Sequence, residues 1–188
     1  DTFNFVYTTA TVSYTGNQCL KTFGPFLPGG GSGGTQLRPA LPGQIGTGQI
    51  RALNWSADPL DSVDFGVYKI EFLNASLQLA AGGLAGVDIF ESNPINAALP
   101  PDTWTLLGVG TAPAPVGTVW ARAVIVKVDV DGAQGGSIFW DTAALLQPVD
   151  CVSHAASAAT LKLLPTTPNP FSPSTNIHFA LTQDGRID

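Results

Sequence analysis

The fold is decided by residues 103–146, which begin Thr103-Trp-Thr-Leu-Leu-Gly-Val-Gly-Thr111 and end Ser137-Ile-Phe-Trp-Asp-Thr-Ala-Ala-Leu-Leu146. Three runs rich in β-branched and aromatic residues (103–111, 118–130 and 137–146) are separated there by two breaks rich in Pro, Gly and Asp. Proline lacks the N–H donor that a strand ladder needs, so the first break ends a strand. Glycine in the second break supplies the positive φ of a hairpin loop. The pattern predicts an antiparallel meander of three strands.

The rest of the chain has the same strand-like character. Phe3, Phe5 and Tyr7 alternate with polar or smaller residues within 1–14, which is the period of a strand with one buried face. Similar short runs recur between turn signals, and no stretch has a convincing helical period. The Gly-rich segment 27–35 is expected to be a flexible loop without regular structure. We therefore predict an all-β fold: an antiparallel β-sandwich or jelly roll with an extended C-terminal β-segment.

Composition excludes several classes of partner. The chain is 44% hydrophobic and 12% charged, and it carries a net charge of −6. Low charge with many Gly, Pro, Thr and Val residues favours an extracellular β domain. No basic stripe is present to neutralise phosphates or anionic headgroups, so we expect neither nucleic acid nor a membrane surface as a partner. No apolar run approaches the roughly 20 residues that span a bilayer, so membrane insertion is not expected.

We divide the chain into three parts. Residues 1–147 form the predicted sandwich. Residues 148–163 are rich in Ala and Ser, have no clear period and are expected to be a linker. Residues 164–188 form a terminal segment with a motif of its own. Because the chain starts without Met and has no signal peptide, we expect a processed protein that is secreted or attached to the cell surface.

The two cysteines, Cys19 and Cys151, are far apart in sequence, which excludes a CxxC redox or zinc motif. They are either two buried free thiols or a disulfide between neighbouring strands. The expected export favours the disulfide. Closing so long a loop would stabilise the fold by roughly 4–5 kcal/mol in the chain-entropy model.

Three runs carry a resemblance to a known family: Asp102-Thr-Trp-Thr-Leu-Leu-Gly-Val-Gly-Thr-Ala-Pro113, Val119-Trp-Ala-Arg-Ala-Val-Ile-Val126 and Ser137-Ile-Phe-Trp-Asp-Thr-Ala-Ala-Leu145. They are similar to the last three strands of the jelly-roll carbohydrate-binding modules found beside bacterial glycoside hydrolases. Thr15-Gly-Asn-Gln-Cys-Leu-Lys21 resembles the Ser-Gly-x-x-Ala-Leu strand of the same modules. The resemblance covers most of residues 12–147 and implies a jelly roll. It implies binding less specifically, because such jelly rolls also serve as spacers and structural modules.

Sugar binding uses exposed aromatic rings, which stack on the apolar faces of sugars, with amides or charges nearby. Alternation places Trp120 and Arg122 on one face of their strand, and it places Trp140 opposite to Phe139 in direction. Trp120 and Trp140 would then share the face away from the core, with Trp55 in a nearby loop. We predict a carbohydrate-binding face of Trp55, Trp120, Arg122 and Trp140. The alternative is that one or more of these tryptophans fills the core or a subunit contact.

In the resembled modules, calcium is often held by an acidic residue near the N-terminus and by the second Asp of a Phe-Asp-Asp strand. Asp141 stands at that second position, whereas Trp140 replaces the first Asp and no acidic N-terminal partner is evident. The resemblance thus implies calcium (Ca2+) at Asp141 with backbone carbonyls, although the sequence requires no cofactor. Asp129-Val-Asp131-Gly132 has two carboxylates and no third at a useful spacing, so we interpret it as a hairpin turn.

The terminal segment contains Asn169-Pro-Phe-Ser-Pro-Ser-Thr175, and residues 164–181 resemble the opening of the C-terminal sorting domain of type IX secretion cargo. The resemblance implies export from a Bacteroidota-like bacterium. The segment is shorter than that domain and forms about one and a half strands, which cannot bury their own face. We therefore predict that Ile177, Phe179 and Leu181 form an assembly strand on another sheet, in this molecule or in a neighbouring copy.

The sequence offers little for catalysis. A nucleophile needs an adjacent base, and the histidines lie in the linker (His154) and the terminal segment (His178). The carboxylates are scattered rather than paired as in glycosidases. We therefore expect no enzyme. Ser62 and Thr142 follow aspartates in short triplets that resemble Bacteroidota O-glycosylation sites, so we predict glycans at these two residues.

Two functional hypotheses follow. The first is a non-catalytic structural protein that assembles with copies of itself into an extracellular filament or surface layer, by addition of a terminal strand to a neighbour's sheet. The low charge and the unfinished terminal strand favour it. The second is a carbohydrate-binding module of a secreted or surface-attached bacterial protein, with a polysaccharide as its partner. The resemblance of residues 12–147 favours this alternative.

Overall fold

The computed structural model describes residues 2–132, 135–146, 162–163 and 179–180. The chain divides into two compact units, Asp1–Pro148 and Val149–Asp188. In the second unit, β12 (Lys162–Leu163) pairs antiparallel with β13 (Phe179–Ala180). Most of the predicted linker (148–163) and terminal segment (164–188) lies outside the described residues.

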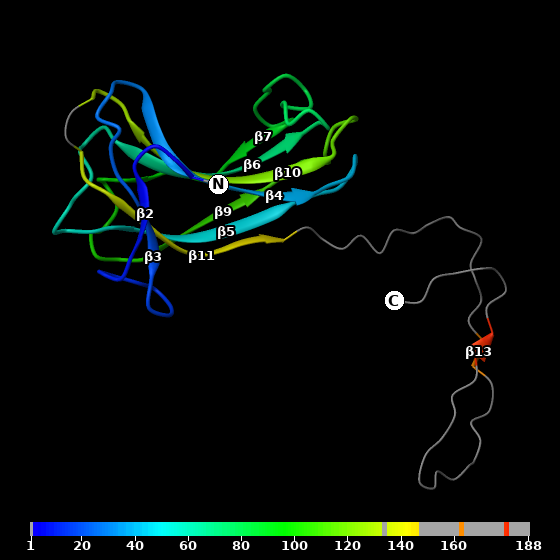
Figure 1. Ribbon diagram of the computed structural model, residues 1–188, viewed down its shortest axis with the longest axis horizontal. Coiled ribbons are helices and arrows are strands. Elements are labelled where there is room, and N and C mark those ends of the chain that lie inside the picture. Colours follow the sequence, from blue (N-terminus) through cyan, green and yellow to red (C-terminus); the bar gives the residue numbers. More distant parts are fainter. Residues whose placement is uncertain (1, 133–134, 147–161, 164–178, 181–188) are drawn as a thin grey trace, which may run out of the picture. The chain divides into compact units, whose positions relative to one another are not determined.

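The first unit is a sandwich of two antiparallel sheets, which form the two layers of Figure 1. Sheet A has the order β1–β4–β10–β6–β7 with β8 beside β6, and sheet B has the order β2–β3–β11–β5–β9. The strands are β1 (Thr2–Phe3), β2 (Val6–Thr9), β3 (Cys19–Thr22), β4 (Gly30–Pro39), β5 (Thr47–Asn54), β6 (Phe65–Leu73), β7 (Ile89–Glu91), β8 (Ile95–Asn96), β9 (Thr105–Gly110), β10 (Trp120–Asp129) and β11 (Ile138–Leu146). The predicted all-β sandwich is confirmed. The described residues contain no helix long and apolar enough to cross a membrane.

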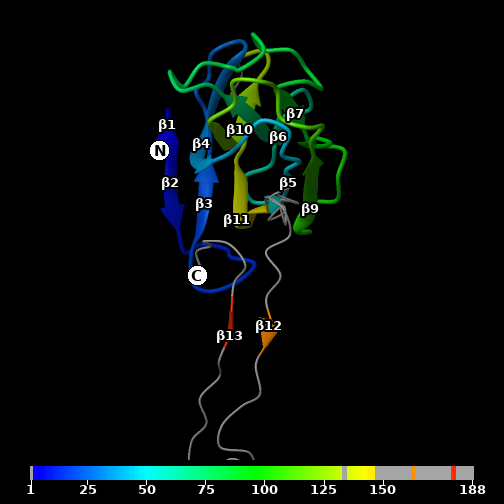
Figure 2. The same ribbon diagram turned by 90° about the vertical axis from the view of Figure 1, so that its right-hand side faces the viewer.

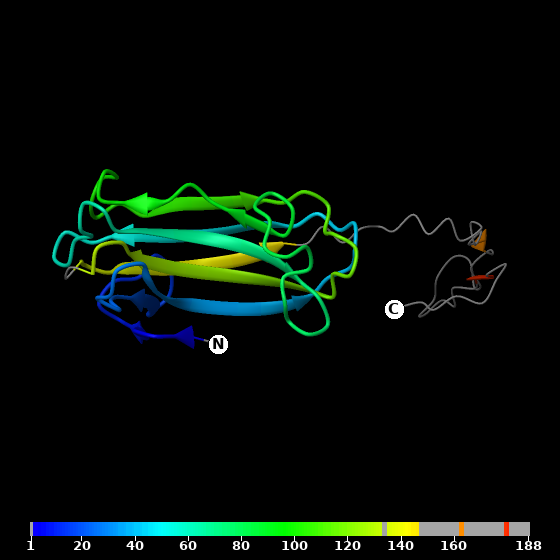
Figure 3. The same ribbon diagram turned by 90° about the horizontal axis from the view of Figure 1, so that it is seen from above.

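The three decisive runs do form strands, but the predicted meander is wrong. β9 and β11 lie in sheet B with β5 between them, and β10 lies in sheet A, so none of the three pairs with another. Figure 3 shows the sandwich from above. Sheets in a sandwich are about 10 Å apart, and the links between these strands cross from one layer to the other. Two backbone hydrogen bonds hold the link between β9 and β10 in place. Thr111 N donates to Gly46 O (3.0 Å), and Ala114 N donates to Gln44 O (2.8 Å).

The Gly-rich segment is also different from the prediction, because most of it is a strand. β4 pairs along its whole length with β10, from Gly30 opposite Asp129 to Pro39 opposite Trp120. A Cβ atom at Gly33 would lie 1.9 Å from the Ile125 carbonyl oxygen. Glycine is therefore needed for a close approach of two backbones, and its flexibility is lost in the ladder.

The N-terminal segment supplies an edge strand to each sheet. β1 pairs with β4 of sheet A, and β2 pairs with β3 of sheet B. Asn4, which lies between them, has a positive φ of 58° and turns the chain from one layer to the other. Figure 2 shows β1 and β2 following each other along one side of the sandwich. The segment thus contributes two short strands in place of one long one.

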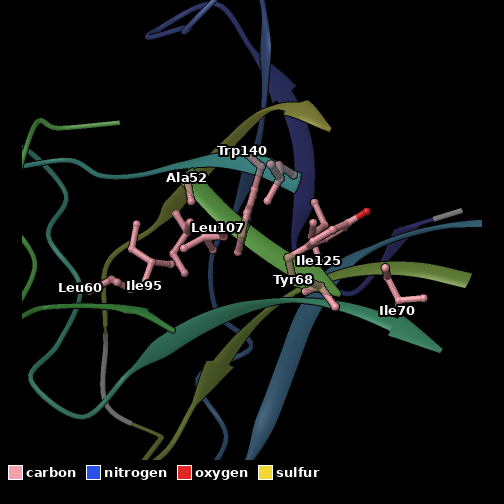
Figure 4. Packing of buried hydrophobic residues seen from close by; sticks show 11 residues of the cluster. Ala52, Leu60, Tyr68, Ile70, Ile95, Leu107, Ile125 and Trp140 are labelled. Atoms are coloured by element: carbon pink, nitrogen blue, oxygen red, sulfur yellow. The ribbon is translucent and has the colours of Figure 1, made fainter. Parts of the chain in front are cut away.

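The core fills the space between the sheets (Figure 4). Its largest member is Trp140, which is 2% exposed and points between the layers, where its Nε1 donates to Thr22 Oγ1 (2.9 Å). Gly66 of sheet A makes room for the indole, because a Cβ atom there would lie 3.0 Å from the ring. The prediction that Trp140 faces away from the core is therefore wrong.

Candidate functional site

The four residues of the predicted carbohydrate-binding face lie in three places. Trp140 is in the core. Trp55 lies outside sheet B, where its ring meets Phe139 edge-on at 5.6 Å. Trp120 and Arg122 lie on β10 of sheet A, two residues apart and hence on one face. Of the four, the structure brings only Trp120 and Arg122 together.

Arg122 lines a shallow groove on the outer face of sheet A, with a volume of about 330 Å³. The groove, which we call the sheet A groove, is lined by Phe3, Thr35, Lys69, Glu71, Arg122, Val124 and Val126. Its charges are paired across strands: Arg122 Nη2 lies 2.6 Å from Glu71 Oε2, and Lys69 Nζ lies 2.5 Å from Glu91 Oε1. The groove offers one aromatic ring and charges that already have partners.

A larger pocket of about 420 Å³ lies where loops meet the ends of β2, β3 and β11. We call it the Lys21–Asp58 pocket. It is lined by Tyr7, Lys21, Phe23, Phe26, Asp58, Pro59, Gly135, Gly136 and Ser137. Strand pairing brings Tyr7 and Lys21 together, because Tyr7 of β2 lies directly opposite Lys21 of β3. Tyr7 is 47% exposed and Phe26 is 39% exposed, so two rings are accessible to a ligand.

The polar centre of this pocket is a connected set of three side chains. Lys21 Nζ donates to Asp58 Oδ2 at 2.8 Å, and Ser137 Oγ donates to the same oxygen at 2.6 Å. Aromatic rings surround the ammonium group, with the Tyr7 and Phe23 centroids each 5.9 Å away. A cation over ring faces is stabilised by the ring quadrupole, so the rings stabilise the ammonium group in addition to Asp58.

These contacts favour the protonated form of Lys21 and the ionised form of Asp58. Partial burial works to lower the pKa of Lys21, but the hydrogen bond and charge of Asp58, with Tyr7, outweigh it and raise the pKa. Burial likewise works to raise the pKa of Asp58, but hydrogen bonds from Lys21 and Ser137 and the charges of Lys21 and Lys127 lower it. A lysine held protonated is no nucleophile or base, so the arrangement suits binding rather than proton transfer.

Sequence reasoning missed this pocket. Tyr7 was recognised as an alternating strand residue, but its partner Lys21 follows only from the β2–β3 register. Asp58 lies in a turn and reaches Ser137, which is 79 positions away in sequence. The N-terminal alternation predicts that Phe5 and Tyr7 are buried, which is wrong, because these residues are 43% and 47% exposed. The sequence therefore carries no local signal for this pocket.

Calcium does not fit at Asp141. Its Oδ2 accepts from the backbone N–H groups of Tyr14 (2.7 Å) and Thr15 (3.0 Å), and its Oδ1 accepts from that of Thr142 (2.6 Å). N–H donors point positive charge at the carboxylate and occupy the place where a cation would bind. Asp141 therefore fastens the 14–15 turn to β11.

The structure describes only Cys19 of the predicted disulfide. Cys19 is a buried free thiol whose Sγ donates to Val12 O at 2.9 Å. Burial, and then the charge of Asp141, raises the pKa of Cys19 to about 11, so the thiol stays protonated. Cys151 lies outside the described residues.

The remaining predicted sites stay predictions. Ser62 and Thr142 are both exposed, and Ser62 Oγ donates to Asp61 Oδ1 at 3.2 Å. Of the assembly strand, Phe179 lies in β13, while Ile177 and Leu181 lie outside the described residues.

No protein-family model and no curated protein matches the chain. Solved structures do match. The chain is similar to the CBM22-1 and GH10 modules of the Clostridium thermocellum endo-1,4-beta-D-xylanase 10B complexed with xylohexaose, with 9% identity and a TM-score of 0.50, covering 85% of this chain and 26% of that chain. It is similar to an arabinose-bound GH51 α-L-arabinofuranosidase, with 15% identity and a TM-score of 0.50, covering 79% of this chain and 23% of that chain.

A third match is a structure of carbohydrate-binding modules from the β-sandwich superfamily, with 17% identity and a TM-score of 0.47, covering 75% of this chain and 52% of that chain. The chain thus spans about half or less of the length of these three structures. At such identities the two likenesses with a TM-score of 0.50 show the fold alone, an all-β sandwich of the kind found in carbohydrate-active proteins.

Proposed function

We propose that this chain is a non-catalytic carbohydrate-binding module of a secreted or surface-attached protein, and that its ligand binds in the Lys21–Asp58 pocket. The fold supports the first part, because solved structures of carbohydrate-active proteins share the sandwich. The carboxylates support the absence of catalysis. Glu71 and Glu91 are in cross-strand ion pairs, and Asp88 accepts three backbone N–H groups, so all three have structural roles.

One observation carries the proposal: accessible rings lie beside a polar centre in one concave site. The Tyr7 and Phe26 rings can stack on the C–H faces of a sugar, while the ammonium of Lys21 and the carboxylate of Asp58 can bond to its hydroxyl groups. The polar centre is already organised by Ser137, so little ordering is required when a ligand binds. The sheet A groove combines these features less well, because it offers one ring.

The self-assembling filament lacks comparable support. Its assembly strand rests on Phe179, which pairs within the second unit through β13, and on two residues outside the described part of the chain. No contact among the described residues favours strand addition.

The proposal is tested with a glycan array on the parent protein, followed by isothermal titration with the best oligosaccharide. Tyr7→Ala and Phe26→Ala each remove an exposed ring, and we expect each to weaken binding at least about tenfold, as for loss of one well-buried apolar contact. Tyr14→Ala is the matched control, because Tyr14 is 45% exposed and lies outside the pocket. It should leave the affinity unchanged.

Three results are decisive. Loss of binding in Tyr7→Ala with retention in Tyr14→Ala supports the pocket. Loss in Phe3→Ala, which removes the one ring of the sheet A groove, with retention in Tyr7→Ala moves the site to that groove. A parent protein that binds no glycan on the array rejects the function altogether.

A further inference from the structure

Three carboxylates meet at the end of sheet A, close to the β10–β11 turn. Asp64 precedes β6, Asp129 ends β10 and Asp131 follows in the turn. One oxygen of each lies within 4.8 Å of the others. The sequence pattern around Asp129 and Asp131 offers no third carboxylate at a useful spacing, and the fold supplies one from Asp64, just before β6.

The hydrogen bonds of Asp64 and Asp129 leave acceptor capacity on both carboxylates. Asp64 Oδ2 accepts from Lys127 Nζ at 2.6 Å, and Asp64 Oδ1 accepts from Val130 N at 3.0 Å. Asp129 Oδ1 accepts from Gly132 N at 2.8 Å. Each carboxylate oxygen has two lone pairs, so Asp64 keeps about one on each oxygen after these bonds.

Asp129 is the anomaly in this cluster. Its side chain is 0% exposed, and its Oδ2 is a buried oxygen without a hydrogen-bond partner among the described residues. Burying a carboxylate oxygen unpaired is costly, and a second buried carboxylate nearby adds repulsion. Lys127 is paired with Asp64, and no ion pair joins Asp129 to a cation among the described residues.

We propose that Asp64, Asp129 and Asp131 bind a divalent cation, and that this cation is Ca2+. Hard oxygen ligands are what Ca2+ prefers, and its flexible geometry tolerates a site in which Lys127 holds one of the oxygens. A bound cation gives the orphaned Asp129 Oδ2 a partner. Asp131 is exposed, so the ion can enter from solvent. None of the three carboxylates lines the proposed sugar pocket.

The site is tested on the whole chain by thermal unfolding in EDTA and in about 10 mM CaCl2, with the dissociation constant taken from isothermal titration. Extracellular calcium modules bind with constants of about 10⁻⁴ to 10⁻³ M, so the midpoint should rise by about 5 °C or more at the tight end of that range. Asp129→Asn and Asp131→Asn should each weaken Ca2+ binding at least about tenfold, because each removes a ligand charge. Glu91→Gln, a one-charge change at an exposed ion pair, should bind Ca2+ like the parent.

The direction in which Asp129→Asn changes the stability, with and without Ca2+, distinguishes a ligand from a structural residue. In EDTA, Asp129→Asn should be as stable as the parent or more stable, because it relieves repulsion and its Oδ1 can still accept from Gly132. In CaCl2 the order should reverse. If Asp129→Asn does not fold, Asp131→Asn at the exposed position gives the same comparison. No rise in the parent's midpoint with CaCl2, or an equal rise in both variants, overturns the proposal. An equal rise with MgCl2 overturns its assignment to Ca2+.

Discussion

Two lysine–aspartate pairs of the same chemistry lie in opposite environments. In the first, Lys21 and Asp58 are 2.8 Å apart, and their side chains are 17% and 37% exposed. In the second, Lys127 and Asp64 are 2.6 Å apart, and their side chains are 0% and 1% exposed. The pairs are close enough for the charge of Lys127 to lower the pKa of Asp58.

The degree of burial decides which kind of ligand such a pair can bind. Around Lys21 and Asp58 the charges balance and face a solvent-filled pocket with aromatic walls, so they can bind a neutral polar ligand. Around Lys127 and Asp64, two further carboxylates share the site. The Asp129 carboxylate is buried and its Oδ2 has no hydrogen-bond partner among the described residues, so this site favours a cation.

The largest expected effect comes from removing the buried cation. Lys127→Met leaves the cluster without its counter-charge, and we expect the free energy of unfolding in EDTA to fall by about 3–5 kcal/mol. Lys69→Met, which breaks the more exposed pair with Glu91, should cost about 1 kcal/mol or less. Urea denaturation of both variants measures this. Similar losses in the two would contradict the contrast between buried and exposed pairs.

Substitutions at two adjacent glycines, Gly135 and Gly136, test the two sites separately. A Cβ atom on Gly135 would lie 2.0 Å from Asp64 Oδ2, and one on Gly136 would lie 2.0 Å from the Pro59 carbonyl oxygen. Both glycines line the Lys21–Asp58 pocket, so we expect both alanine variants to reduce oligosaccharide binding. Only Gly135→Ala should also reduce the response to Ca2+. Each should cost about 1–3 kcal/mol of stability, because the clash must be relieved by movement of the neighbour.

Titrations of the two variants are the measurement. Gly136→Ala is the control for the Ca2+ response of Gly135→Ala, since both add one methyl group to the same turn. The division into two sites is wrong if Gly136→Ala abolishes the Ca2+ response while the fold is retained.

The smallest expected effect is the pH dependence of the exposed pair. The pKa of Asp58 is lowered from 3.8, so its stabilisation is present above pH 3.8 and is lost as the pH falls through the lowered value. The pKa of Lys21 is raised from 10.5, so its stabilisation is present below pH 10.5 and is lost as the pH rises through the raised value. The difference in melting temperature between the parent and Asp58→Asn should be level between these limits and shrink outside them. A difference that peaks near neutral pH would require another titrating group.

Most strands were predictable because alternation and turn residues report burial locally, whereas β4 was not, because its glycines indicate a loop. Their pairing was not, since β9, β10 and β11 find their partners across the sandwich. Trp140 shows why face assignment failed. β11 is covered on both sides, with Trp140 in the core and Phe139 beneath Trp55, so its alternation does not say which face is inside.

The sites were harder to predict for the same reason. Arg122 was correctly placed outward beside Trp120, because one strand contains both. Lys21 with Asp58, and Asp64 with Asp129, are brought together by long-range contacts that no local spacing records. What the sequence contains is each residue's chemistry, and what the fold adds is which residues share a site.

The most direct test of the proposed function is an amide NMR titration of the ¹⁵N-labelled chain with the best oligosaccharide from the array. Binding in the Lys21–Asp58 pocket predicts the largest shifts at Tyr7, Lys21 and Ser137, with those of Lys69, Arg122 and Val124 unchanged. The largest shifts at Lys69, Arg122 and Val124, or no shifts at any ligand concentration, would contradict it.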